Sequence, residues 1–515
     1  MLFGNPAIKI TNLTKRFGDL TAVSDLSLSI PRGELFGLVG SDGAGKTTTL
    51  RMLTGVLDAD SGEARVLDCP CSELEPVRSR IGYMSQRFGL YPDLTVMENI
   101  RFHADIFDVP KAEWRERAER LLAMSGLTPF TGRRAGALSG GMKQKLGLCC
   151  ALIHTPTVLF LDEPTNGVDP VSRRDFWRIL DTLLSEGVTI VVATAYLDEA
   201  ERCHRVGLLH HGRLLACDTP HKLKKLADPA IIDPCLEDVF ISVLGEGADA
   251  TVIRRTPPDL RIAPIAVSLE RLTRRFGSFT AVNQISLNVP KGEIFGFLGP
   301  NGAGKSTTIR MLCGILEPTE GTGHVAGFDV TGQAELIKEN IGYMSQKFSL
   351  YEDLTVEENI AFYGGIYRLS RHQLAARADW VIEMAGLTER RTAKAGELSA
   401  GWRQRLALGC ALLHNPPIIF LDEPTAGVDP LNRRRFWQLI HQLAADGVTV
   451  FVTTHYMDEA EYCDRLALIY RGELVAVGTP QELKQQRCSN GQLPSLEQVF
   501  IDLIEERDAV EGAAP

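Results

Sequence analysis

Short apolar runs bounded by turn residues recur along this chain and predict buried strands. Residues 34–39 form one such run, which leads into a glycine-rich segment, and residues 48–54 then have a helical pattern. Residues 158–161 and 418–421 are further apolar runs, and each is followed by two acidic residues. Strands that are apolar along their whole length are typical of parallel sheets covered on both faces. The pattern therefore predicts an α/β fold.

The pattern occurs twice, because residues 8–244 recur at 267–504. The sequence IGYMSQ, for example, begins at Ile81 and again at Ile341. A unit of this size is too long for a solenoid repeat and predicts a duplicated domain. The segment between the two units has three prolines and no clear periodicity, which is typical of a linker. We predict a first domain at 1–244, a linker at 245–264, a second domain at 265–505 and a tail at 506–515.

Composition narrows the function classes. The chain has 515 residues, with 55 Lys and Arg against 65 Asp and Glu and a formal net charge of -10, so electrostatics give no reason to expect nucleic-acid binding. Its 11 cysteines form no C-x-x-C pair, which argues against a zinc site and indicates thiols in a reducing cytosol. No apolar run reaches the roughly 18 residues of a membrane-spanning helix, and the N-terminus lacks a signal-peptide pattern. We expect a chain that does not span a membrane.

A phosphate-binding loop is predicted in each half, because residues 40–47 and 299–306 match G-x-x-x-x-G-K-[ST] between a strand and a helix. Glycines let backbone N–H groups face phosphates, and the helix dipole adds a positive end. Lys46 and Lys305 are expected to reach the β- and γ-phosphates of ATP. Two matches in register leave little room for a chance glycine-rich turn. The predicted ATP-binding residues of these loops are Gly40, Ser41, Asp42, Gly43, Ala44, Gly45, Lys46, Thr47, Thr48, Gly299, Pro300, Asn301, Gly302, Ala303, Gly304, Lys305, Ser306 and Thr307.

The acidic pair after each later apolar run is expected where a parallel strand ends beside a phosphate-binding loop. The first acid can hold Mg²⁺ together with the hydroxyl that follows the loop lysine. The second acid can polarise the water that attacks the γ-phosphate. The alternative is that these acids cap a helix before Pro164 and Pro424. The expected Mg²⁺ ligands are Thr47, Asp162, Ser306 and Asp422, and the expected water-polarising residues are Glu163 and Glu423.

These motifs, in this order, resemble the ATP-binding-cassette (ABC) family of transporter ATPases across nearly the whole chain. Residues 138–144, Leu-Ser-Gly-Gly-Met-Lys-Gln, are similar to the signature segment of that family. The resemblance implies two P-loop nucleotide-binding domains that hydrolyse ATP with Mg²⁺, each with a helical subdomain at about 87–155 and 347–415. It also implies further site residues: signature residues Ser139, Gly140, Gly141, Gln144, Ser399, Gly401 and Gln404, D-loop residues Asp169 and Asp429, Mg²⁺-linked Q-loop residues Gln86 and Gln346, and the switch histidine His455.

The aromatic residues Phe17 and Phe276 lie where the family stacks an aromatic side chain on the adenine ring. A core aromatic on the first strand pair is the alternative. The family resemblance also implies that the two domains enclose two ATP molecules head to tail. Each site would then combine the phosphate loop of one half with the signature of the other.

The two halves differ at positions that this arrangement brings to one site. Ala195 occupies the position that matches His455, and Ala400 replaces a signature glycine. The first loop has Ser41 and Asp42 where the second has proline and asparagine, and an extra carboxylate near phosphate is unfavourable. We predict one competent site, with catalytic residues Glu423, His455 and Gln346, and one site that mainly binds ATP. Because Glu163 is retained, hydrolysis at both sites is the alternative.

Aromatic-rich stretches follow each Q-loop glutamine, at 88–96 and 348–356, and are similar to the type-2 drug-export branch of the family. That resemblance implies two separate membrane permease subunits, a peripheral location on the cytoplasmic face of the inner membrane and, more weakly, a periplasmic adaptor. No nucleic-acid partner is expected. The residues expected either to contact a permease helix or to lie in the core of the helical subdomain are Phe88, Leu90, Tyr91, Phe348, Leu350 and Tyr351.

Two other functions have tandem cassettes. A ribosome-acting ATPase typically has a long, helical, charged linker and two intact signatures, whereas the linker here is short and contains proline. A sugar-import ATPase usually has a degenerate second phosphate loop, whereas residues 299–306 are complete. Both remain alternatives to drug or xenobiotic export.

Overall fold

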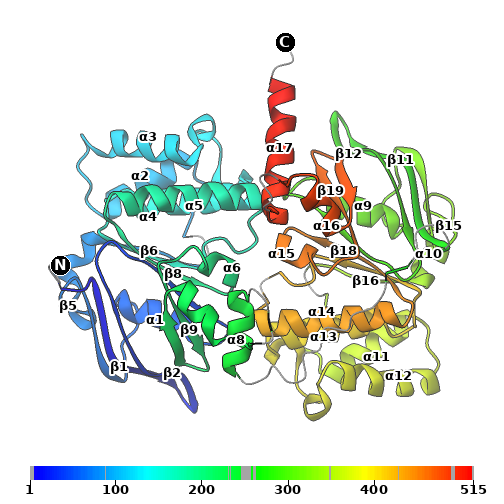
Figure 1. The fold of residues 1–515 in the computed structure, drawn as a ribbon, viewed down its shortest axis with the longest axis horizontal. Helices are drawn as coiled ribbons and strands as arrows, with labels where there is room; N and C mark the ends of the chain where they lie inside the picture. The colour runs from blue at the N-terminus through cyan, green and yellow to red at the C-terminus, as the bar shows by residue number, and fades with distance from the viewer. Residues whose placement is uncertain are drawn as a thin grey trace. The chain divides into compact units, whose positions relative to one another are not determined.

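The computed structural model describes residues 5–86, 89–229, 231, 234–244, 257–258, 263–346, 349–426, 428–488 and 493–512. They form two compact units, one built mainly from each half of the chain (Figure 1). Each unit is an α/β structure with helices beside a mostly parallel sheet, which confirms the predicted fold class. Most of the predicted linker, 245–264, lies outside the described residues. Within the described parts, no helix has the length and apolar character needed to cross a membrane.

An antiparallel sheet opens the first unit. Strands β1 and β2 form a hairpin whose register runs from Ile8 opposite Ile30 to Phe17 opposite Leu20, with a two-residue turn at Gly18 and Asp19. Gly18 has a φ of 58°, which favours glycine in such a turn. The strands of this sheet, in spatial order, are β2 (Leu20–Ile30), β1 (Ile8–Phe17), β4 (Ser61–Val66) and β5 (Cys69–Pro70).

A six-stranded sheet forms the centre of the first unit and aligns the site. Its strands β3, β7 and β8 are buried along their whole length, as the continuous apolar runs predicted. Because five of the strands are parallel, the carboxyl ends of β3, β8 and β7 meet at one edge. The spatial order is β10 (Arg213–Asp218), β9 (Arg205–His210), β3 (Leu35–Gly40), β8 (Thr189–Thr194), β7 (Val158–Asp162) and β6 (Ile81–Met84). The accompanying helices are α1 (Lys46–Leu53), α5 (Pro170–Ser185), α6 (Leu197–Ala200), α7 (Pro220–Leu223) and α8 (Leu236–Leu244).

Three further helices occupy the stretch predicted as a helical subdomain. They are α2 (Val96–Ile106), α3 (Trp114–Ser125) and α4 (Gly140–Leu152). Helix α2 begins at a capping box formed by Thr95 and Glu98, and α3 ends at Gly126, whose φ is 70°. The three helices share one apolar core with the sheet through fully buried side chains such as Ile100, Leu122 and Leu146.

The second unit repeats this architecture. Its antiparallel sheet contains β12 (Phe279–Pro290), β11 (Ile265–Phe276), β14 (Glu320–Val325) and β15 (Phe328–Asp329). Its central sheet contains β16 (Ile341–Met344), β17 (Ile418–Asp422), β18 (Thr449–Thr454), β13 (Ile294–Leu298), β19 (Arg465–Tyr470) and β20 (Glu473–Gly478). Its helices are α9 (Lys305–Leu312), α10 (Ala334–Asn340), α11 (Val356–Ile366), α12 (Arg371–Met384), α13 (Ala400–Ala411), α14 (Pro430–Ala445), α15 (Met457–Ala460), α16 (Pro480–Gln485) and α17 (Leu496–Gly512).

The two units differ at their last helices, α8 and the longer α17. Residues 506–512, predicted to belong to a frayed tail, instead continue α17 (Figure 1). Polar contacts explain the extension, because Arg507 pairs with Glu473 and the Tyr470 hydroxyl donates to Asp508 at 3.2 Å. Residues 513–515 lie outside the described part of the chain.

Candidate functional site

The first phosphate-binding loop joins β3 to α1 as predicted. Two of its glycines are sterically required, because a Cβ at Gly40 would lie 2.2 Å from the Leu209 carbonyl oxygen and one at Gly45 would lie 2.3 Å from that of Ala22. Gly45 also has a φ of 100°. The Lys46 ammonium is buried inside the loop, where Nζ donates to the Gly40 carbonyl at 2.7 Å. A buried cation at a helix start suits a phosphate ligand.

The second loop, between β13 and α9, has the same construction. Lys305 Nζ donates to the Gly299 carbonyl at 2.7 Å and to the Pro300 carbonyl at 3.1 Å. Burial lowers the pKa of Lys305, and the charge of Glu423 opposes that effect. Both predicted lysines therefore occupy equivalent positions, although the loops differ in sequence.

A hydroxyl and a carboxylate meet beside each loop, which fits a magnesium site. Thr47 Oγ1 donates to Asp162 Oδ1 at 3.0 Å, and Ser306 Oγ donates to Asp422 Oδ1 at 3.2 Å. Asp162 Oδ2 is buried without a hydrogen-bond partner among the described residues, and burial raises the pKa of this carboxyl group. A bound cation would satisfy that oxygen. Mg²⁺ typically takes one or two protein oxygens together with waters and substrate phosphates, so a larger protein ligand set is unnecessary.

One predicted Q-loop glutamine contacts a predicted catalytic residue. Gln86 and Gln346 are both exposed. Gln346 Nε2 donates to Glu423 Oε2 at 2.7 Å, so its amide nitrogen contacts the second acidic residue. The structure therefore brings Gln346 to the predicted catalytic group and leaves the expected metal role of both glutamines as a prediction.

Glu163 lies at the end of β7 with few polar partners. Its Oε1 lies 3.3 Å from Lys46 Nζ, and its Oε2 accepts a hydrogen bond from the Ala195 backbone N–H at 3.1 Å. Burial raises the pKa of this carboxyl group even though Lys46 opposes the shift. The backbone of Glu163 has a φ of 49°, a left-handed conformation that is unusual outside glycine and often found at functional sites.

Glu423 has the same backbone conformation but more cationic and donor partners. His455 Nδ1 lies 3.2 Å from its Oε1, and Lys305 Nζ lies 3.4 Å from the same oxygen. Burial alone would raise the pKa of Glu423, but His455 and Lys305 outweigh it and lower the pKa to about 2. The His455 Nε2 atom is buried and has no hydrogen-bond partner in the part of the chain that the structure describes. The second unit therefore holds an ionised carboxylate beside a histidine.

One contributing residue was missed in the sequence. Thr453 Oγ1 donates to Asp422 Oδ1 at 2.6 Å and accepts from the Glu423 N–H at 3.1 Å, so it links both acids. The matching residue in the first unit is Ala193, which has no hydroxyl group. An alignment of the two halves could have revealed this difference, because it pairs Ala193 with Thr453 two positions before it pairs Ala195 with His455.

The signature segments form the starts of α4 and α13. Ser139 caps α4 by accepting from the Met142 N–H at 3.3 Å, whereas Ser399 makes no side-chain cap on α13. A Cβ added at Gly140 would meet only the Gly167 carbonyl, at 3.7 Å, which is an ordinary contact. An alanine at this position, as at Ala400, therefore fits within its own unit. Gly141, Gln144, Gly401 and Gln404 are all buried.

The remaining predicted residues are the two D-loop aspartates and the two aromatic residues of the first strands. Asp169 and Asp429 are buried and directly precede α5 and α14. Phe17 and Phe276 are 49% and 47% exposed at the ends of β1 and β11, which excludes the core alternative for both. The Arg274 guanidinium lies 4.7 Å from the Phe276 ring centroid. An exposed ring near a cation is suited to stacking on a base.

Comparisons with known proteins agree with this geometry. A family model described as ABC transporter matches residues 23–166 and 282–426. YbhF of Escherichia coli, a probable multidrug ABC transporter ATP-binding protein, is 43% identical over 97% of this chain and 98% of its own length. The linearmycin resistance ATP-binding protein LnrL of Bacillus subtilis is 41% identical over 42% of this chain and 69% of its own length.

Among solved structures, an archaeal ribosome recycling factor, determined with a ribosomal stalk protein, has a TM-score of 0.68. It covers 97% of this chain and 98% of its own, but at 20% identity the likeness shows the fold alone. The family assignment rests instead on the sequence matches, which cover both halves and, for YbhF, nearly the full length of both proteins. The chain belongs to the ABC transporter family, as an ATP-binding and ATP-hydrolysing protein.

Proposed function

We propose that this chain is the ATP-hydrolysing subunit of a type-2 ABC export system and drives two separate membrane permease subunits, with drugs or other xenobiotics as cargo. The observation that carries the proposal is a groove in the first unit, beside the Q-loop position, with an exposed apolar rim. The names of YbhF and LnrL associate those proteins with multidrug transport and linearmycin resistance, which supports export.

The groove has a volume of about 490 Å³ and is lined from α2, α4 and the end of β6. Two of its lining residues, Val56 and Ile106, are 66% and 56% exposed. Exposed apolar side chains around a concave surface suit the apolar face of a short amphipathic helix. Such a helix on the cytoplasmic side of a permease subunit is the proposed occupant.

The aromatic-rich stretches support this contact in part. Leu90 lines the groove, and Tyr91 is exposed beside it with its ring against Phe102. Leu350 in the second unit packs against the core, as the alternative interpretation expects, whereas Tyr351 is exposed. Phe88 and Phe348 lie outside the described residues.

Hydrolysis is proposed to depend mainly on Glu423. Its contacts with Lys305, Gln346 and His455 fix the position of the carboxylate and favour its ionised form, in which it can polarise the attacking water. Thr47 and Asp162, and Ser306 and Asp422, are the residues that would hold Mg²⁺. The cation, when bound, neutralises charge on the β- and γ-phosphates.

The head-to-tail arrangement implied by the family is part of the proposal. The signature at Ser139 and Gly140 would then complete the site of Lys305, and the altered signature at Ala400 would complete that of Lys46. An alanine Cβ is accommodated within its own unit. Ala400 would therefore weaken only the binding of a phosphate that approaches the start of this helix from outside the unit. A peripheral location on the cytoplasmic face of the inner membrane, and a periplasmic adaptor, complete the proposed system.

Affinity purification from solubilised native membranes tests the transporter proposal. The bait is the Glu423→Gln chain with ATP, and the wild-type chain and Ile106→Asp serve as matched controls. We expect polytopic membrane proteins to co-purify at stoichiometric yield, and we expect Ile106→Asp to lower that yield. Co-purification of ribosomal proteins, or of no membrane protein from a well-solubilised sample, would overturn the proposal and leave only the ATPase.

A further inference from the structure

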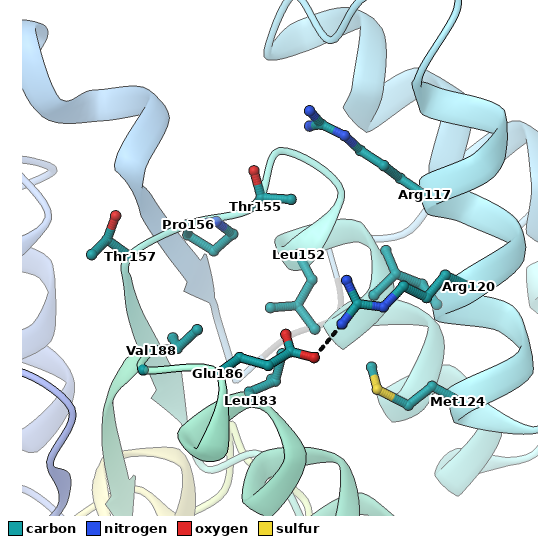
Figure 2. Close-up of a pocket in the computed structure, with 12 residues that line it drawn as sticks. Arg117, Arg120, Met124, Leu152, Thr155, Pro156, Thr157, Leu183, Glu186 and Val188 are labelled. Atoms are coloured by element: carbon teal, nitrogen blue, oxygen red, sulfur yellow. Dashed lines mark hydrogen bonds and ion pairs between the residues drawn. The ribbon is translucent and has the colours of Figure 1, made fainter.

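A second cavity in the first unit (Figure 2) shares no lining residue with the phosphate-binding loop or with the groove described above. Its volume is about 290 Å³, and it is lined by α3, the end of α4, the loop before β7 and the turn between α5 and β8. The apolar part of the lining consists of Leu121, Met124, Leu152, Leu183 and Val188. The cavity therefore lies between the helical layer and the central sheet layer of one unit.

Two arginines and one glutamate supply the charges of the lining. Arg120 pairs with Glu186 across the cavity, and Figure 2 shows both side chains directed toward one another. Arg117 donates to the Ile153 carbonyl at 3.3 Å, at the end of α4. Arg117 also pairs with Glu113 and is partly buried, whereas the Arg120 side chain is 62% exposed. A ligand can therefore exchange with Glu186 at Arg120 at little cost. The lining carries one net positive charge.

The second unit contains an aromatic ring at the matching position. Trp380 replaces Arg120, and it packs against the buried side chains of the sheet core and of the helical subdomain. Arg377, the counterpart of Arg117, donates to the Leu413 carbonyl at 3.1 Å, and its guanidinium carbon lies 4.3 Å from the Trp380 ring centroid. The indole of Trp380 thus lies in the second unit at the position that matches the cavity of the first unit. In both units an arginine, Arg117 or Arg377, donates to a backbone carbonyl just after the matching helix, α4 or α13.

We propose that the cavity in the first unit binds a flat aromatic anion, a ring system with a carboxylate, in the place that Trp380 occupies in the second unit. The ring would stack on Arg117 as Trp380 stacks on Arg377, with Met124 and the leucines against its other sides. The carboxylate would accept hydrogen bonds from Arg120. An apolar cavity with a few charged groups at one side is typical of a small-molecule site.

Equilibrium binding of naphthoate to the full-length wild-type chain tests this assignment, with its uncharged methyl ester as the matched probe. We expect one saturable naphthoate site per chain and an affinity for the ester that is lower by about tenfold, because the ester cannot form the charge-assisted bond. Arg120→Trp supplies the residue of the second unit and is expected to abolish binding of both compounds. Unchanged affinity in Arg120→Trp, or no saturable binding by the wild-type chain, would overturn the proposal.

Two further variants keep the test decisive if that substitution disturbs folding. Arg120→Glu leaves the cavity open, so it should weaken naphthoate binding and retain the ester. Trp380→Arg removes the indole of the second unit and is expected to raise the stoichiometry to two sites. Each variant is first checked for wild-type ATPase activity, since neither position contacts the phosphate-loop residues. Equal naphthoate binding by all these chains would also refute the site.

Discussion

Glu163 and Glu423 occupy equivalent positions in the two units and have the same φ of 49°, yet their carboxyl groups have different electrostatic surroundings. Glu423 contacts a lysine, a glutamine and a histidine, and its pKa falls to about 2. Glu163 contacts a lysine and one backbone N–H, and burial raises its pKa. His455 in place of Ala195 accounts for much of the difference, because it contacts the Glu423 carboxylate and lowers its pKa. A duplicated domain can therefore keep its backbone conformation while a side-chain difference reverses the direction in which the pKa of an acid shifts.

The largest expected effect comes from removing each carboxylate in turn. Glu423→Gln should lower the steady-state ATPase rate about 100-fold or more, the size of a lost general base, and Glu163→Gln should lower it less than about threefold. Phosphate release at saturating ATP measures both, with nucleotide binding as the control for an intact site. If Glu423→Gln and Glu163→Gln lowered the ATPase rate equally, both in steady state and in a single turnover, the proposed difference between the two sites would be wrong.

A smaller effect is expected from Thr453, which bonds to both Asp422 and Glu423. Thr453→Val keeps the shape of the side chain but removes the hydroxyl that orients a proposed metal ligand. We expect the Mg²⁺ concentration for half-maximal ATPase activity to rise about tenfold, in line with other residues that support metal ligands. Thr453→Ser retains the hydroxyl and should behave as the wild type. A wild-type Mg²⁺ dependence in Thr453→Val would exclude this role.

The smallest expected effect concerns stability against pH. Because the folded-state pKa of Glu423 is lowered from 4.5 to about 2, its contribution to stability is complete above pH 4.5 and is lost as pH falls toward 2. The pKa of Glu163 is raised above 4.5, so the contribution of this group to stability falls as pH rises from 4.5 to the raised folded-state pKa. At neutral pH, Glu423→Gln should lower Tm by at least about 2–4 °C, the effect of roughly 1 kcal/mol in a domain of this size, and Glu163→Gln should not lower it.

Thermal unfolding between pH 7 and pH 3 measures these shifts. The Tm difference between wild type and Glu423→Gln should stay constant down to pH 4.5 and narrow below it. Two results would contradict the assigned directions of the pKa shifts. One is a Tm difference between wild type and Glu423→Gln that already narrows above pH 4.5, and the other is a larger loss of Tm in Glu163→Gln than in Glu423→Gln.

The phosphate-binding loops could be predicted from the sequence because their chemistry is local. The strand, the loop and the helix that carry Lys46 and Lys305 are consecutive in the chain, and steric demands fix glycine at Gly45 and Gly304. The two acidic strand ends were also predictable, since buried parallel strands have a recognisable apolar pattern. The family and the fold class followed from these motifs and their order.

Contacts between distant segments could not be predicted in the same way. Sequence position alone does not reveal that Gln346 donates to Glu423, because the two residues are 77 positions apart. The direction of each pKa shift depends on the balance between burial and nearby charges, which requires coordinates. The helical residues 506–512 were not predicted because their contacts are with distant strands: Arg507 pairs with Glu473 of β20, and Asp508 accepts a hydrogen bond from Tyr470 of β19.

The left-handed backbone at Glu423 has a consequence for how this protein can change. A non-glycine residue in that region carries roughly 1–2 kcal/mol of conformational strain, which glycine would relieve. A Glu423→Gly chain would thus lose the carboxylate that we propose acts in hydrolysis, while the backbone strain at this position would be relieved. Relief of that strain would be offset by the loss of the contacts with His455 and Lys305, which stabilise the fold at neutral pH.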